Sequence, residues 1–122
     1  MKNINFFLTV SLMLFALTGF GAIKTEQCPA TPDESGWTEF FCLGKKGTFQ
    51  GAAITHRDQY YITCYFNNSD KTQLCSIEKG SKNKITPPES GSLWTQTDPL
   101  ALYTCKSASQ ANCKFNINPS PN

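Results

Sequence analysis

The sequence predicts an all-β fold: a small antiparallel β-sandwich or open barrel that three disulfide bonds staple together. Three observations lead to this prediction. The chain of 122 residues contains six cysteines, an even number typical of a disulfide framework in a small exported protein. About seven short segments rich in β-branched and aromatic residues alternate with turn-forming clusters. After residue 21, no segment shows the 3.6-residue periodicity of an amphipathic helix.

The first 21 residues have the pattern of a secretory signal peptide. Lys2 precedes an apolar run at 6–17, and Gly19-Phe20-Gly21 supplies a cleavage site with small residues at both ends. The apolar run is shorter than the roughly 20 residues of a spanning helix, although a retained membrane anchor is the alternative. We expect an exported protein, periplasmic or extracellular, with one mature domain at 22–117, a disordered tail at 118–122 and no membrane span.

The mature chain opens with an extended, loop-like stretch at 22–36, which is polar and contains two prolines and a glycine. Strands are expected where aromatic and β-branched residues gather between turn formers. The segment 60–66 has the strongest pattern, because it alternates strictly between two faces. Tyr60, Ile62, Cys64 and Phe66 share one face, and Tyr61, Thr63 and Tyr65 share the other. In order, the expected strands are 37–43, 48–55, 60–66, 72–78, 93–97, 100–105 and 113–117.

Glycines, prolines and polar clusters separate these strands. Turns are expected at 44–47 and 56–59, and Gly51 is expected at a β-bulge within its strand. The segment 79–92 is polar and rich in breakers, so it is expected to be a long loop.

The six cysteines allow 15 connectivities, and spacing favours one of them. In a hairpin whose facing residue numbers sum to 139, Cys64 faces Cys75 across a turn at 68–71. Cys105 and Cys113 flank a polar stretch that can close as a loop, which leaves Cys28 with Cys42. A crossed alternative, Cys28–Cys64 with Cys42–Cys75, stays open.

Composition argues against several other classes of protein. A structural zinc site needs close pairs such as C-x2-C, whereas the smallest gap here is the eight residues between Cys105 and Cys113. We therefore expect no metal and no cofactor. Removal of Lys2 leaves 10 basic and 9 acidic side chains. A net charge of about +1 creates no field that would drive non-specific binding to nucleic acid or to an anionic membrane.

One enzymatic hypothesis centres on the only histidine. Some small ribonucleases transfer phosphoryl groups with one His, one Arg and one Glu, and His56 and Arg57 are adjacent here. Glu39 or Glu78 would then be the base. Neighbouring residues point to opposite sides of a strand or turn, so this alternative requires an irregular turn. The other interpretation is a solvated hairpin turn.

The aromatic residues lead to a second hypothesis, a binding surface. Five aromatic residues exceed what one thin core needs on its inner face: Trp37, Tyr61, Tyr65, Trp94 and Tyr103. If the face of Tyr61 and Tyr65 is open, it offers a surface for sugar stacking or protein contact; in a sandwich, a second sheet can instead cover it. Lysines of the predicted long loop can steer an acidic partner or merely keep that loop solvated: Lys79, Lys82 and Lys84.

The segment Phe49-Gln50-Gly51-Ala52-Ala53-Ile54, followed by Tyr61-Ile62-Thr63-Cys64-Tyr65, comes after an opening Cys28-Pro29. It resembles a group of small exported bacterial proteins of unknown function, in which a Cys-Pro begins the mature domain and a hairpin leads into a Cys-Tyr strand. The resemblance covers residues 28–75. It implies a periplasmic or secreted address and a β-rich fold, and it supplies no catalytic residues.

These observations together predict a monomeric, non-enzymatic secreted protein that binds another protein or a glycan. One version of this function is an effector or a hydrolase inhibitor, with the 79–92 loop inserted into the enzyme's cleft. The alternative is the small secreted nuclease that uses His56 and Arg57.

Overall fold

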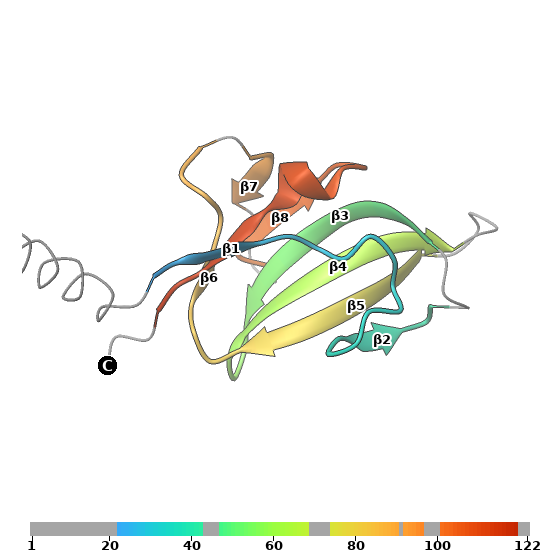
Figure 1. The fold of residues 1–122 in the computed structure, drawn as a ribbon, viewed down its shortest axis with the longest axis horizontal. Helices are drawn as coiled ribbons and strands as arrows, with labels where there is room; N and C mark the ends of the chain where they lie inside the picture. Colours follow the sequence, from blue (N-terminus) through green and yellow to red (C-terminus); the bar gives the residue numbers. More distant parts are fainter. Residues whose placement is uncertain (1–21, 43–46, 69–73, 91, 97–100, 120–122) are drawn as a thin grey trace, which may run out of the picture.

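The computed structural model describes residues 22–42, 47–68, 74–90, 92–96 and 101–119. Nine strands within these ranges form two antiparallel sheets that pack as a sandwich and do not close into a barrel (Figure 1). The predicted all-β class is therefore confirmed, in its sandwich form. The proposed signal peptide, residues 44–46 of the predicted turn and residues 120–122 lie outside the described ranges, whereas Gly47 begins β3.

The larger sheet has six strands in the order β2-β5-β4-β3-β8-β7. The smaller sheet has three strands in the order β1-β9-β6 and lies across one face of the larger one (Figure 1). The bounds are β1 Lys24–Glu26, β2 Thr38–Phe40, β3 Gly47–His56, β4 Tyr60–Asn68, β5 Leu74–Ser81, β6 Ile85–Thr86, β7 Trp94–Gln96, β8 Tyr103–Lys106 and β9 Phe115–Ile117. A single turn of 3-10 helix, η1 (Gln110–Cys113), precedes β9.

The hairpin of β3 and β4 is the centre of the larger sheet. Its register places Ile54 opposite Ile62 and Phe49 opposite Phe66, so that apolar side chains of both strands point to the same side. The pairing shifts between Phe49 and Gly51, which confirms the bulge predicted at Gly51. The alternation predicted for 60–66 is confirmed as well, because Ile62, Cys64 and Phe66 are all buried.

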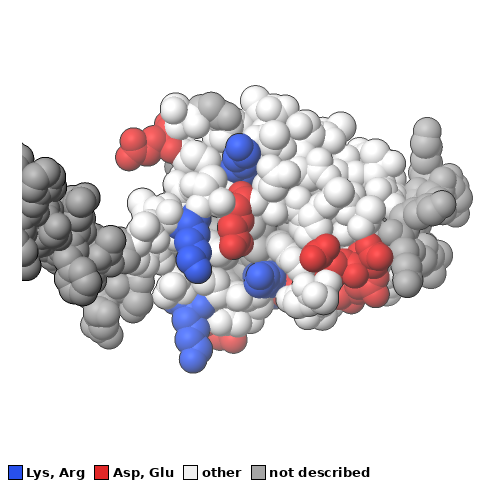
Figure 2. All heavy atoms as spheres, viewed as in Figure 1, with Lys and Arg blue, Asp and Glu red and all other residues white. Residues whose placement is uncertain are grey.

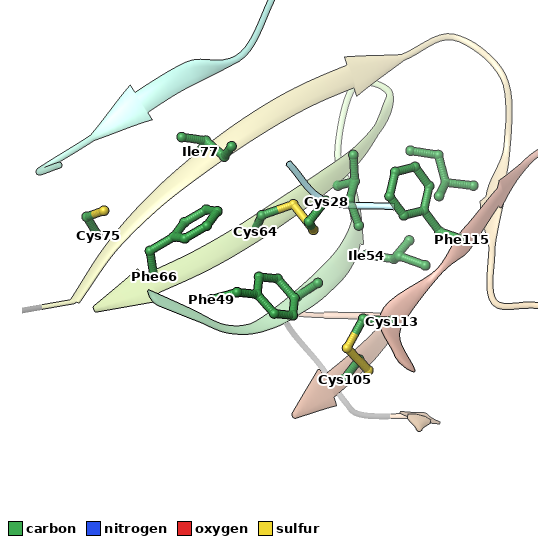
Figure 3. Close-up of a cluster of buried hydrophobic side chains, with 13 residues drawn as sticks. Cys28, Phe49, Ile54, Cys64, Phe66, Cys75, Ile77, Cys105, Cys113 and Phe115 are labelled. Carbon is green, nitrogen blue, oxygen red and sulfur yellow. A yellow bond between two sulfur atoms is a disulfide. The ribbon is translucent and has the colours of Figure 1, made fainter. Parts of the chain in front are cut away.

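The core lies between the two sheets (Figure 3). Phe49 and Phe66 pack edge to face, with 5.8 Å between their ring centres. Phe115 and Ile85 come from the smaller sheet, and each is about 1% exposed. We call the core side of the six-stranded sheet its inner face and the opposite side its outer face.

The disulfides follow the crossed pattern, Cys28–Cys64 and Cys42–Cys75, together with Cys105–Cys113. The favoured pairs Cys64–Cys75 and Cys28–Cys42 were wrong because the hairpin register was wrong by two residues. Facing residues of β4 and β5 sum to 141, so Cys75 lies opposite Phe66, and Cys64 lies opposite Ile77. Cys64 then points into the core, where it meets Cys28. Three disulfides indicate an oxidising, exported environment.

Three short elements differ from the sequence prediction. Residues 24–26, expected to be loop-like, form β1 because they pair with β9. The predicted loop at 79–92 contains the end of β5 and the whole of β6. The stretch between Cys105 and Cys113 closes through η1. Asn118, placed in the predicted tail, donates hydrogen bonds to the Lys84 carbonyl and to Thr86 Oγ1 at 3.0 Å.

Two of the disulfides close chain segments of very different length, so we expect their removal to lower the free energy of unfolding by different amounts. In the chain-entropy account, a disulfide that closes 36 residues restricts the unfolded chain more than one that closes eight. We expect the double variant Cys28→Ala/Cys64→Ala to lose about 4 kcal/mol of unfolding free energy, and Cys105→Ala/Cys113→Ala about 2.5 kcal/mol. Denaturant unfolding measures both values. Equal losses, or the reverse order, would contradict the account.

A second prediction concerns Gly51 in the bulge. Its φ is +154°, and a Cβ atom added there would collide with the carbonyl oxygen of Cys105. We expect Gly51→Ala to lower the free energy of unfolding by about 3 kcal/mol. Gly36 is the matched control, since its φ is +88° and a Cβ atom would meet nothing within 4 Å. Gly36→Ala should lose only about 1 kcal/mol. Equal losses in thermal or denaturant unfolding would show that the contact with Cys105 is unimportant.

Candidate functional site

The outer face of the six-stranded sheet is the open face of the sandwich. Tyr61, Thr63 and Tyr65 point to this side, because their neighbours Ile62, Cys64 and Phe66 are buried on the other. In the described ranges the smaller sheet covers only the inner face. Within the described ranges this tyrosine face therefore has no second sheet over it, with Tyr61 and Tyr65 partly exposed and Thr63 between them buried at 8% exposure.

Two adjoining hollows lie on the outer face. The larger, which we call the apolar hollow, has a volume of about 700 Å³. Its floor is the small residues Gly51 and Ala53 of β3, and Leu74, Thr104 and Lys106 stand at its sides. Small floor residues flanked by larger neighbours leave a concave surface. Tyr65 and Thr55 line both hollows, so that the Tyr65 side chain forms the wall between them.

The smaller hollow, which we call the aromatic hollow, has a volume of about 440 Å³. It combines three aromatic rings, three aliphatic hydroxyl groups and one ion pair. The rings belong to Phe40, Phe41 and Tyr65, the hydroxyls to Thr55, Thr63 and Ser76, and the ion pair to Arg57 and Glu78. A concave site that mixes apolar walls with a few convergent polar groups is typical of ligand binding.

The ion pair closes one end of the aromatic hollow. Arg57 Nη2 donates to Glu78 Oε1 at 2.8 Å, and Thr63 Oγ1 donates to Glu78 Oε2 at 3.3 Å. The guanidinium also lies 4.0 Å from the centre of the Tyr61 ring. The hydrogen bond that Arg57 donates to Glu78 is the largest of the causes that raise the pKa of Arg57. With side-chain exposures of 58% for Arg57 and 20% for Glu78, the pair adds little stability but fixes both groups in position.

The Tyr65 side chain is half-buried and ends in a polar hydroxyl group. Burial raises the pKa of its phenol, and the nearby Glu78 carboxylate raises it further. The phenol is therefore protonated at neutral pH and able both to donate and to accept a hydrogen bond. In the described part of the chain, its hydroxyl makes no hydrogen bond.

Phe41 adopts an uncommon backbone conformation at the rim of the aromatic hollow. Its φ is +62°, in the left-handed region that bulky residues rarely enter, and its side chain is 78% exposed. It lies between β2 and Cys42, whose disulfide with Cys75 anchors the segment to β5. Such outliers persist only where the surrounding structure imposes them, and they concentrate at functional sites.

Of the residues of the nuclease hypothesis, the structure brings Arg57 and Glu78 together and places His56 and Glu39 on the other face of the sheet. His56 continues the inner-face alternation of Ile54, and its ring stacks on Tyr60 with 4.3 Å between the ring centres. Arg57 extends to the outer face, where it binds Glu78. Glu39 pairs with Ile77 across the sheet edge, so it lies on the opposite face from Glu78. Proton transfer needs groups within about 3 Å of the same substrate, and this arrangement places His56 on the opposite face from Arg57 and Glu78.

The two tryptophans lie away from the outer face. Both are half-buried and pack against the core. The Nε1–H of Trp94 donates to the Lys114 carbonyl at 2.7 Å, and the ammonium of Lys79 lies 5.7 Å from the centre of the Trp37 ring. Of the four predicted binding aromatics, the structure therefore places Tyr61 and Tyr65 on the outer face, where Tyr65 lines both hollows and Tyr61 lines neither, and leaves Trp37 and Trp94 elsewhere.

The three predicted binding lysines do not form one loop. Lys79 belongs to β5, whereas Lys82 and Lys84 are exposed between β5 and β6. On the side of the molecule that carries β1, Figure 2 shows basic and acidic side chains interspersed. This side therefore presents no broad patch of one charge to a partner.

Sequence reasoning missed Phe40, Phe41 and Thr55, which line the aromatic hollow. Adjacent phenylalanines at 40 and 41 break strand alternation, since one of the two must face away from the core. That break was the available signal. Thr55 carries no comparable signal, because a threonine in a strand is ordinary.

No family model, curated protein or solved structure matches this chain. The resemblance to small exported bacterial proteins thus stays a prediction. Among the described residues, no cluster of three or more His, Cys, Asp or Glu side chains is placed to hold a metal ion. The same residues include no helix with the length and apolar character needed to cross a membrane.

A hydrogen bond between Tyr61 and Asp58, in the turn beside this site, makes the stability of the fold depend on pH. The hydroxyl of Tyr61 donates to Asp58 Oδ1 at 2.9 Å and is the main cause that lowers the pKa of that carboxyl. We expect Tyr61→Phe to raise the pKa of Asp58 toward its ordinary value, which an NMR titration of the Asp58 carboxyl carbon measures. Because the folded pKa is lowered, the associated stability is present above the unfolded pKa and is lost as pH falls through the folded one. An unchanged Asp58 pKa in the variant would refute the assignment.

Proposed function

We propose that this protein is an exported, non-enzymatic binding domain that uses the outer face of its six-stranded sheet to bind a protein or a glycan. One observation supports the proposal: among the described residues no second sheet covers the tyrosine face, which contains two adjoining hollows that share Tyr65 and Thr55. Exposed apolar residues border the same face, with Leu74 at 55% and Phe40 at 41% exposure. Apolar surface left open to water in a chain of this size commonly marks a place where another molecule binds.

The arrangement of titratable groups supports binding over catalysis. On the outer face, the acid and base candidates Arg57 and Glu78 are paired with each other, while His56 stacks on Tyr60. A paired guanidinium and carboxylate can hold a polar ligand by hydrogen bonds. The nuclease alternative receives no support from this geometry.

The inhibitor version of the proposal receives less support than a face-binding version. It needs residues 79–92 to form a projecting loop. Residues 79–81 instead belong to β5, and Ile85–Thr86 form β6, where Ile85 is buried. We therefore place the binding surface on the sheet and away from this segment.

If ligands bind at the outer face, the Tyr65 side chain should control affinity for a protein and for a glycan alike. The mature protein would be screened against an immobilised array of neutral and acidic oligosaccharides and against a phage-displayed library of random 12-residue peptides. The substitution Tyr65→Ala removes the side chain that separates the two hollows. We expect it to lower the affinity for every selected ligand by about tenfold or more.

Tyr103→Ala is the matched control for this screen. Tyr103 is another half-buried tyrosine, but it pairs with Ile54 and packs against the core on the inner face. Its loss should change affinity by less than about twofold once both variants are confirmed to be folded. Ligands that bind equally well to the Tyr65→Ala variant, or an absence of ligands from both screens, would refute the proposed site.

A further inference from the structure

We propose that the aromatic hollow binds a neutral sugar unit of a glycan, with an apolar face of the sugar ring against Phe41 or Tyr65 and its hydroxyls on Arg57 and Glu78. This inference rests on the proposed function, since it names the ligand class of the outer face.

The composition of the hollow matches the two-sided chemistry of a sugar. A pyranose ring has C–H groups that pack against aromatic rings, and hydroxyl groups around its edge that both donate and accept hydrogen bonds. Three rings line the aromatic hollow, and the strand register places Phe40 and Tyr65 on either side of Ser76. Its other groups include an acceptor carboxylate, a donor guanidinium and three hydroxyls, which can do either.

The ion pair retains unused hydrogen-bonding capacity. An ionised carboxylate accepts at about four lone-pair sites. Glu78 uses one on Arg57 and one on Thr63 in the described structure. Arg57 has five N–H donors and commits one of its terminal nitrogens to Glu78. Adjacent sugar hydroxyls can therefore bind to both groups while the ion pair stays intact.

Charge favours a neutral sugar over an acidic one. Arg57 and Glu78 are the only charged side chains among the described residues that line the aromatic hollow, and their charges cancel. An acidic sugar would bring its carboxylate next to Glu78 and would have to compete with Glu78 for Arg57. A purely apolar group would remove water from the ion pair and the hydroxyls without replacing those hydrogen bonds.

The backbone at Phe41 offers a sharp test. Glycine adopts a φ of +62° without steric penalty, so Phe41→Gly removes the ring while it relieves the backbone. The variant should fold at least as well as the wild type. Because the fold is not weakened, a loss of binding in this variant would measure the contribution of the Phe41 ring to ligand affinity.

The experiment is an NMR titration of the ¹⁵N-labelled mature chain with three kinds of probe. These are neutral oligosaccharides (chitotriose, maltotriose, cellotriose and galactobiose), acidic tri-galacturonic acid, and a phenylalanine-rich peptide. We expect one or more neutral probes to shift the amides of Thr55, Thr63 and Ser76. Phe41→Gly should weaken that binding by about fivefold, and Glu78→Gln by about tenfold, as expected for lost hydrogen bonds to a charged group.

Two substitutions outside the hollow are the controls. Glu26→Gln makes the same chemical change as Glu78→Gln on an exposed residue of β1, and Leu93→Ala removes an apolar side chain that is 52% exposed and lies outside both hollows. Neither should alter neutral-sugar affinity by more than about twofold.

The remaining outcomes separate this inference from the proposed function. Binding of only the acidic sugar or the peptide, with loss in Phe41→Gly, would overturn the neutral-sugar inference and leave the outer-face site standing. Sugar binding that shifts only the smaller sheet and survives both substitutions would overturn the inference and the proposed site. No binding by any of these probes would overturn the inference, whereas the proposed site would then stand or fall on the array and peptide screens.

Discussion

The Cys28–Cys64 disulfide is the constraint on which the rest of the structure depends. It joins the segment after β1 to the middle of β4, across 36 residues of sequence. Both sulfurs are almost completely buried, so the bond pins the smaller sheet over one particular face of the larger one (Figure 3). By fixing which face is covered, it also fixes which face stays open. Tyr61 and Tyr65 of β4 face outward because Cys64, on the alternate positions of the same strand, faces inward.

The other two disulfides shape the edges of the same scaffold. Cys105–Cys113 closes η1 against β8 and brings β9, with Phe115, into the core. Cys42–Cys75 ties the end of β2 to β5 at the edge of the outer face. Phe41 stands directly before that bond, and the anchored backbone holds its ring at the rim of the aromatic hollow. The covalent framework thus reaches from the core to the site.

The sequence was sufficient to predict the fold class and the two faces of β4, because these depend on local alternation and on cysteine number. It was insufficient for the pairing of Cys64, because a shift of two residues in the hairpin keeps the same faces and changes only the partner. The strand β1 escaped prediction because its three residues are all exposed and owe their conformation to β9. For the site, Tyr61 and Tyr65 were found by alternation. Phe41 and Thr55 were not, since a hollow depends on which strands lie side by side.

An open apolar face and a small core make opposing demands on stability. Each exposed side chain such as Leu74 or Phe41 forgoes about 25 cal/mol for every Å² of apolar surface that it leaves in water. A single domain of roughly 100 residues has only some 5–15 kcal/mol of net stability to lose. Disulfides stabilise chiefly by restricting the unfolded chain, so their contribution does not require that any further surface be buried. Three such bonds therefore let the chain leave Phe40, Phe41 and Leu74 uncovered and still fold, which a core of this size alone would support less readily.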